Sequence, residues 1–350
     1  MRALLRRGIS GGAEHGKMLR SWRSRRCVTG VRLLIHHHRQ GIDTDMHNLV
    51  TSPPPPLQLG IIDWLTTPWE RVFMQHAFLA IIIVGIVCGV IGCFVVLRGM
   101  AFVGDAFAHA VFPGVVIAFL LGGSIFIGAL IAAVIVSLLI GVLTQSERMR
   151  EDAAIGVTFA GAFALGIALI SATGSYSRDL SSFLLGNILG VSRADLLLTA
   201  GTGALVLAVL AIFRREFVLI TFDRTLATAL GIRLWRFDQL FLVLLALAIV
   251  TALQTVGNVL VLAMLITPAA TARLLADRLP RMLLISATIG ALSGVGGLYL
   301  SYYRNVASGA AVVLTATACF FIVWIAVHLR DPLRRLQRMR AHATPPPVTS

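Results

Sequence analysis

The sequence has little charge, a single lysine and few cysteines, and each shortage excludes a class of protein. Only 13% of its 350 residues are charged, whereas 57% are hydrophobic; in soluble domains about 25% of residues are charged. The four cysteines, Cys27, Cys88, Cys93 and Cys319, lack the spacing of a zinc or redox site. The composition therefore excludes an ordinary soluble domain and predicts a polytopic membrane protein.

Long apolar runs follow one another from residue 73 onward. Windows of about 17–25 apolar residues are long enough to span a bilayer as a helix. Nine such runs occur, and because the second and seventh are short or carry polar residues, eight spans also remain possible. The runs are 73–97, 105–121, 124–144, 154–172, 196–213, 238–256, 258–274, 281–302 and 308–328. Without period-two alternation they favour helices over a barrel of strands, so we expect an all-α protein with eight to nine transmembrane helices.

The ends of the chain differ from this apolar region. Residues 1–45 hold ten Lys or Arg and three acidic residues, and their net charge of +7 is half of the +14 of the whole chain. Residues 53–56 are PPPP. No apolar core of a signal peptide is present there. We expect a basic, disordered extension over 1–60, a transmembrane domain over 61–329 and a basic tail over 330–350 that is attracted to anionic lipid. For the extension we favour a translation start near Met46, with a genuine tail as the alternative.

The arginines outside the N-terminal extension predict the orientation. Sixteen lie in one set of alternating loops and in the C-terminal tail, and four lie in the other set. By the positive-inside rule the sixteen face the cytoplasm, as does the C-terminus. Because half of the net positive charge lies in the N-terminal extension and the remaining arginines lie in these loops, we do not expect nucleic acid as a partner. The match to G-x4-G-K from Gly11 to Lys17 is followed by Met18 instead of Ser or Thr, and Lys17 is the only lysine, so we expect no nucleotide site and no enzymatic activity in this chain.

Asp105 and His109 are charged or titratable residues inside an apolar run, in the segment GDAFAHAVFPG. In a helix, residues i and i+4 lie on one face about one turn apart. A carboxylate with a neutral imidazole suits zinc, manganese or iron(II), and an acid at mid-membrane costs about 2.5–3.5 kcal/mol, so such residues usually face a pathway. In the alternative interpretation, Asp105 caps the helix and His109 bonds to a neighbouring helix. Gln254 and Asn258, which flank Gly257 between two spans, could also belong to a path, although such amides more often join helices.

Four segments carry a resemblance to a known family. FVVLRGMAFVGDAFAHAVFPGVVIAF, REDAAIGVTFAGAFALGI, SSFLLGNILGVS and the run from VGNVLVLAMLITPAATARLL to YLSYY occur in order. Together, over roughly residues 62–328, the chain resembles the metal-ion permeases of ABC importers for manganese, zinc and iron, whose fold is related to that of cobalamin and iron-siderophore permeases. The resemblance implies that Asp105 and His109 line the translocation route and hold the metal transiently.

The segment 214–237 looks like the cytoplasmic loop that couples such permeases to their ATPase. Its part DRTLATALGI resembles the short coupling helix, in which small residues allow close packing on a partner, although an ordinary amphipathic loop helix is the alternative. The residues concerned are Phe222, Asp223, Leu226, Ala227, Ala229 and Gly231.

The resemblance also implies partners. They are a second copy of the permease in a homodimer, two copies of an ATP-binding ABC subunit, and an extracytoplasmic metal-binding protein, all at a bacterial plasma membrane. No cofactor is expected to be bound, and the transported divalent ion is the cargo. The alternatives are an ion-coupled secondary metal transporter and a metal-chelate permease; an intramembrane metalloprotease is disfavoured because no H-E-x-x-H occurs.

Overall fold

A computed structural model describes residues 66–145, 149–172 and 188–342, with side chains through Leu329. Contacts divide the chain into two units, Met1–Trp64 and Leu65–Ser350, and all described residues lie in the second. The expected extension over 1–60, the G-x4-G-K match and the favoured start near Met46 therefore lie outside the described residues.

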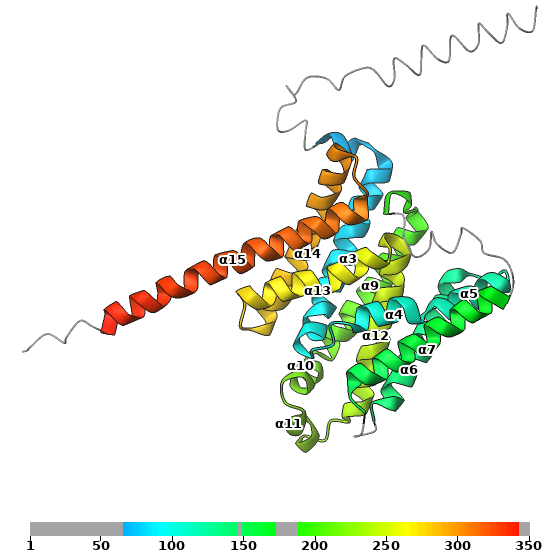
Figure 1. The fold of residues 1–350 in the computed structure, drawn as a ribbon, viewed down its shortest axis with the longest axis horizontal. Helices are drawn as coiled ribbons and strands as arrows, with labels where there is room; N and C mark the ends of the chain where they lie inside the picture. Colours follow the sequence, from blue (N-terminus) through cyan, green and yellow to red (C-terminus); the bar gives the residue numbers. More distant parts are fainter. Residues whose placement is uncertain (1–65, 146–148, 173–187, 343–350) are drawn as a thin grey trace, which may run out of the picture. The chain divides into compact units, whose positions relative to one another are not determined.

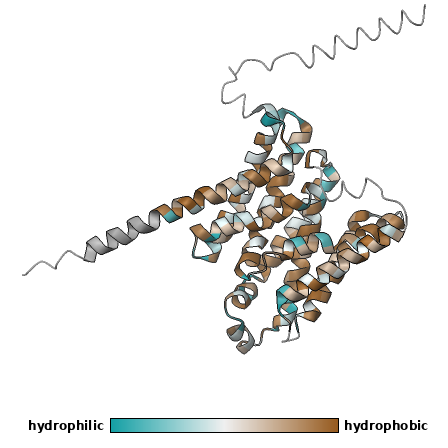
Figure 2. Cartoon of the chain, in the orientation of Figure 1, coloured by the Kyte–Doolittle hydropathy of each residue, from teal (hydrophilic) through white to brown (hydrophobic). Residues whose placement is uncertain are grey.

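Every described secondary-structure element is a helix (Figure 1). The elements are η1 (Thr67–Glu70), α3 (Val72–Leu97), α4 (Val103–Ala110), α5 (Phe112–Leu120), α6 (Ile125–Leu143), α7 (Glu151–Ala172), η2 (Ile188–Gly190), α9 (Arg193–Ile212), α10 (Arg214–Phe222), α11 (Arg224–Ala229), α12 (Leu234–Val256), α13 (Asn258–Leu275), α14 (Leu279–Arg304) and α15 (Ser308–His342). Within the described ranges nine helical segments are long and apolar enough to span a membrane, with α4 and α5 together forming the second of them. Hydrophobic residues cover most of the length of these helices (Figure 2). The all-α polytopic prediction is confirmed, with the larger of the two expected span counts.

Helix α3 is the centre of one packed group, in which it contacts α9, α13 and α14. The contact with α14 is close because glycines face each other: a Cβ added to Gly85 would lie 2.7 Å from the carbonyl carbon of Gly290. One turn further along, the Ser286 hydroxyl donates to the Gly89 carbonyl oxygen over 2.7 Å. Small residues at both surfaces let membrane helices approach closely.

Helix α4 lies between α7 and the pair of helices α12 and α13. It packs against α7 on one side and against α12 and α13 on the other, and α5 continues along α6 and α7. Helix α12 also packs on α6, where the Gln239 side-chain amide donates to the Ser137 carbonyl oxygen over 2.8 Å. A residue on α4 can therefore contact helices that are far away in the sequence.

The second span is broken at Val111, between α4 and α5. Pro113 is within the first two positions of α5, where its missing N–H removes no helical hydrogen bond and its ring fixes the backbone. The sequence predicted a continuous run over 105–121 with a short helix of irregular ends. The break ends α4 one residue after His109, so that Asp105 and His109 share one short helix.

Candidate functional site

The start of α4 tests the interpretation in which Asp105 caps the helix. The N-cap is Phe102, and no side chain caps the helix. Asp105 lies within the first turn, where a carboxylate interacts favourably with the helix dipole. The capping half of the alternative interpretation is therefore wrong, whereas its other half, a bond from His109 to a neighbouring helix, is present as the contact with Asn258 of α13.

Asp105 and His109 come together as their spacing predicted. Their Oδ1 and Nε2 atoms are 3.6 Å apart, and the side chains are 45% and 28% exposed. Both groups therefore face the same accessible side of α4. A charged carboxylate on such a surface of a membrane-spanning segment is unfavourable unless water, protein or an ion contacts it.

Asn258, the first residue of α13, contacts the imidazole of His109. Its Nδ2 lies 3.1 Å from His109 Nε2. Gly257, with φ of 85°, separates α12 from α13 and adopts a conformation that favours glycine. With the Asn258 amide nitrogen as the donor, Nε2 accepts through its single lone pair, which then points toward Asn258, and Nδ1 carries the proton. Sequence reasoning favoured a helix-joining role for Asn258; it does bridge two helices, but at the candidate site itself.

Several polar atoms around this contact are buried without a hydrogen-bond partner among the described residues. They include His109 Nδ1, Asn258 Oδ1 and Gln254 Oε1. Buried polar atoms are nearly always paired with protein or water. These atoms make the junction between α12 and α13 a place where water or a ligand would be stabilised.

Two phenylalanines of α7 hold the other side of the imidazole. The ring centroids of Phe159 and Phe163 lie 5.9 and 5.4 Å from that of His109. Both distances suit aromatic packing, which restricts rotation of the ring. Sequence reasoning missed both residues. The i, i+4 spacing of the two phenylalanines in α7 was the available signal, but nothing in the sequence indicated that they face His109.

Within the described residues no group of three or more His, Cys, Asp or Glu could hold a metal ion. Asp105 and His109 therefore form a pair, to which Asn258 can add an amide oxygen. Divalent ions with oxygen and nitrogen ligands usually have four to six ligands. The described residues of one chain therefore supply an incomplete ligand set.

The predicted short helix in the segment 214–237 is α11. Asp223 caps its start by accepting from the Leu226 N–H over 2.8 Å. Gly231, with φ of 75°, closes its end, where Gly231 and Ile232 donate to the carbonyl oxygens of Thr228 and Ala227. Asp223 and Gly231 thus have roles within the helix itself.

The other four coupling candidates differ in exposure. Ala227 is buried, whereas Ala229 is exposed, and Phe222 and Leu226 are 60% and 47% exposed. Large apolar side chains on an exposed, arginine-rich loop are typical of a contact surface for another protein. Phe222, Leu226 and Ala229 are the candidates available for such a contact.

An ionic cluster adjoins α11, and sequence reasoning did not predict it. Arg98 Nη1 lies 2.9 Å from Asp238 Oδ1, and Arg224 pairs with both Glu151, over 3.1 Å, and Asp238. Burial lowers the pKa of Arg98, and the charge of Asp238 opposes that shift. The cluster joins residues that are up to 140 positions apart.

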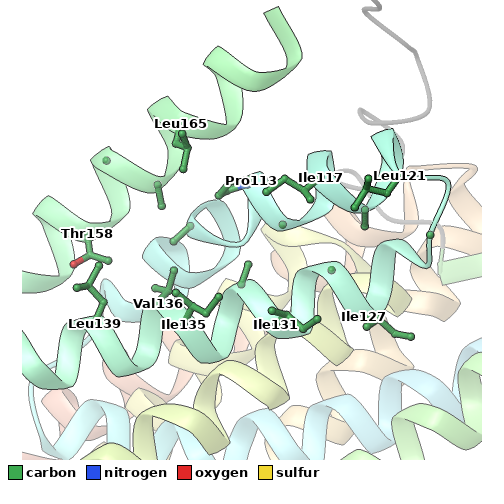
Figure 3. A pocket seen from close by; sticks show the side chains of 18 of the residues that line it. Pro113, Ile117, Leu121, Ile127, Ile131, Ile135, Val136, Leu139, Thr158 and Leu165 are labelled. Atoms are coloured by element: carbon green, nitrogen blue, oxygen red, sulfur yellow. The ribbon is translucent and has the colours of Figure 1, made fainter. Parts of the chain in front are cut away.

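An apolar groove of about 720 Å³ lies between α5, α6 and α7 (Figure 3). Its labelled side chains include Pro113 and Ile117 from α5, Ile131 from α6 and Leu165 from α7, and no charged residue lines it. It therefore offers no metal ligand and is separate from the chemistry of Asp105 and His109.

Known proteins resemble this chain over most of its length. The model of the ABC 3 transport family matches residues 70–327. The chain is 52% identical over 252 residues to the manganese transport system membrane protein MntC of Halalkalibacterium halodurans. The matched residues make up 72% of this chain and 86% of that protein.

Two solved structures resemble it in fold. The first is PsaBC from Streptococcus pneumoniae in complex with Fab, with a TM-score of 0.67 and 42% identity over 76% of this chain and 95% of that one. The second is an inward-facing conformation described as a metal-chelate type ABC transporter, with a TM-score of 0.54 and 19% identity over 78% and 91% of the two chains. The second shows the fold alone.

Proposed function

This chain belongs to the ABC 3 transport family, and we propose that it carries manganese(II) into the cell as the permease of an ATP-driven importer. A relative 52% identical to it is named a manganese transport protein. The exposed carboxylate and imidazole on α4 supply the ligand types that this ion accepts.

The observation that carries the proposal is the geometry of Asp105, His109 and Asn258. Neighbouring ligands about 2.1 Å from an octahedral ion lie roughly 3.0 Å apart, and Asp105 Oδ1 and His109 Nε2 are 3.6 Å apart, so a small side-chain movement lets both contact one ion. Without an ion, the single lone pair of Nε2 accepts from Asn258, so the amide turns away before Nε2 can hold the ion. A cation between the two acceptors removes their repulsion, and rotation of the Asn258 amide then brings its unpaired Oδ1 toward the ion.

An incomplete ligand set suits passage of the ion. A site on a translocation route must bind firmly enough to replace water and weakly enough to release the ion. Two strong ligands and one amide oxygen satisfy both conditions, whereas a full cage would retain manganese. No bound cofactor is needed, since the ion is the cargo.

The exposed side of Asp105 supports a homodimer. At 45% exposure the carboxylate would face lipid in a single chain, at a cost of about 2.5–3.5 kcal/mol. A second copy, related by a twofold axis in front of α4, would cover this face and add its own Asp105 and His109. The route then runs along the dimer axis.

The loop with α10 and α11 supports coupling to a separate ATPase. Phe222, Leu226 and Ala229 are exposed beside arginine-rich segments that the positive-inside rule assigns to the cytoplasm. We propose that each of two ATP-binding subunits docks on one α11 and hydrolyses the ATP, and that an extracytoplasmic metal-binding protein delivers the ion to the opposite face. The C-terminus then lies in the cytoplasm of a bacterial cell.

Uptake into proteoliposomes tests the function. The permease, its ATPase and its binding protein are reconstituted together, and free manganese, zinc and iron(II) are offered with and without ATP. We expect ATP-dependent manganese uptake that falls at least about tenfold in Asp105→Asn and His109→Ala, the loss expected when a metal contact is removed. His76→Ala, which changes a histidine in α3, is the matched control and keeps wild-type uptake.

Other results select the alternatives. Uptake driven by a proton or sodium gradient without the ATPase would identify a secondary transporter. Uptake only of a chelated metal would identify a metal-chelate permease.

A further inference from the structure

We propose that Arg224 links the coupling helix α11 to the metal site by holding α7 and α12 together. The inference rests on the proposed function, because it assigns a positioning role in that transport cycle. Arg224 is the first residue of α11, so any movement that an ATPase imposes on this helix moves its guanidinium group.

The guanidinium group of Arg224 contacts two helices at once. Nη1 donates to Glu151 Oε1 over 3.1 Å, and Nη2 pairs with Asp238 Oδ2. Glu151 is the first residue of α7, and Asp238 lies near the start of α12. The planar fork of arginine can hold two carboxylates in fixed directions, which the single ammonium group of lysine cannot do.

A second arginine extends the link to the helix before α4. Arg98, the C-cap of α3, pairs with the other oxygen of Asp238 over 2.9 Å, and its Nε donates to Thr221 of α10. Its guanidinium carbon lies 4.3 Å from the ring centroid of Phe241. Only the segment 99–102 separates Arg98 from α4.

The helices joined in this way reach His109, α7 directly and α12 through the first residue of α13. Helix α7 carries Phe159 and Phe163, which pack against the imidazole ring. Helix α12 leads through Gly257 to Asn258, which hydrogen-bonds to Nε2. A movement of Arg224 would therefore shift the residues on both sides of the His109 ring. Through Arg98 it would also shift α4, the helix that carries His109.

Burial is concentrated at the Arg98–Asp238 end of this cluster, whereas the side chains of Arg224 and Glu151 are 52% and 40% exposed. The Arg98 side chain is only 10% exposed and that of Asp238 24%, and Arg98 Nη2 is buried without a partner among the described residues. Removing Asp238 would leave the partly buried charge of Arg98 uncompensated, which is far less favourable than losing an exposed pair. A cavity of about 330 Å³, lined in part by Arg224, Glu151 and Asp238, adjoins the cluster and leaves room for the pairs to rearrange.

The test measures manganese transported per ATP hydrolysed by the complete complex in proteoliposomes. Coupling between distant sites typically changes affinities by about 5- to 150-fold, and we expect Arg224→Gln to lower this ratio at least about 5-fold. The ATPase subunit still co-purifies and still hydrolyses ATP. Arg236→Gln, an exposed arginine of the same segment, is the matched control and keeps the wild-type ratio.

A double-mutant cycle separates the link from a general structural role. Glu151→Gln leaves the Arg224–Asp238 and Arg98–Asp238 pairs intact, so it should lower the ratio less than Arg224→Gln does. Combined with Arg224→Gln it should add almost nothing, because the pair is already broken. If Arg224→Gln does not assemble with the ATPase, the reduced ratio of Glu151→Gln alone supports the link.

Two results would overturn the proposal: a wild-type ratio in assembled Arg224→Gln or in Glu151→Gln, or full additivity of the two changes. Either result refutes only the link, because both measurements presuppose that the wild-type complex transports manganese. A wild-type complex that hydrolyses ATP without any uptake of manganese would instead refute the proposed function.

Discussion

Replacing Asn258 separates its two roles, orientation of the imidazole and coordination of the ion. Asn258→Ala removes the 3.1 Å hydrogen bond to His109 Nε2 together with the amide oxygen. A single hydrogen bond contributes about 0.5–1.5 kcal/mol, which corresponds to roughly a 2- to 12-fold change in affinity. Phe159 and Phe163 still pack against the ring, so orientation alone cannot account for a larger loss.

Loss of the oxygen adds to this effect. Because Asn258 Oδ1 is buried without a partner among the described residues, it is free to contact the ion, and we expect Asn258→Ala to raise the KM for manganese about tenfold or more. Asn258→Asp keeps an oxygen and adds charge. It should lower the KM and also lower the maximal rate, since the ion leaves a more anionic site more slowly.

The assay is the initial rate of ATP-driven manganese uptake over a range of free ion concentrations. Thr255→Ala is the control, because its hydroxyl bonds only to carbonyl oxygens of α12. Equal kinetics for wild type and Asn258→Ala would refute a role for this residue. Identical kinetics for the Ala and Asp variants would refute coordination by its oxygen.

Three further predictions concern packing and docking. Gly85→Leu should lower the melting temperature of the purified permease in detergent. Its Cβ would lie 2.7 Å from the backbone of α14, and overpacking costs about 1–3 kcal/mol. Gly156→Ala is the control and should leave the melting temperature unchanged, because a Cβ there meets nothing within 4 Å. Gly231→Ala should weaken the end of α11 by about 1–2 kcal/mol, since φ is 75° there, and proteolysis within the loop should become faster. Leu226→Asp should abolish co-purification of the ATPase without changing the melting temperature, because the side chain is 47% exposed; Phe222→Ala should weaken it. A complex that survives Leu226→Asp unchanged would place the docking surface elsewhere.

The sequence predicts those features that depend on local spacing. Within the described residues, the nine apolar runs form nine helical spans. Lipid offers no partner for backbone N–H and C=O groups, so an apolar run that crosses a membrane must satisfy them within a helix. Asp105 and His109 share a face because they lie four residues apart. Pro113 indicates the break that follows α4, although the exact joint at Val111 required the structure.

Contacts between distant segments could not be predicted in this way. Asn258 lies 149 positions from His109, and the two meet only because Gly257 turns the chain where α13 packs beside α4. Arg98, Glu151, Arg224 and Asp238 each look like an ordinary loop or helix-end charge in the sequence. Their convergence depends on how α3, α7 and α12 pack, which one sequence does not reveal.

Pulsed electron paramagnetic resonance of manganese(II) added to the purified permease tests most directly whether Asp105 and His109 contact the cargo. Nitrogen of a coordinated imidazole couples to the electron spin of the ion. We expect this coupling in the wild type and its loss in His109→Ala, with weaker manganese binding in Asp105→Asn. Nitrogen coupling that persists in His109→Ala, or wild-type affinity in Asp105→Asn, would contradict the assignment of these two residues to the path of the ion.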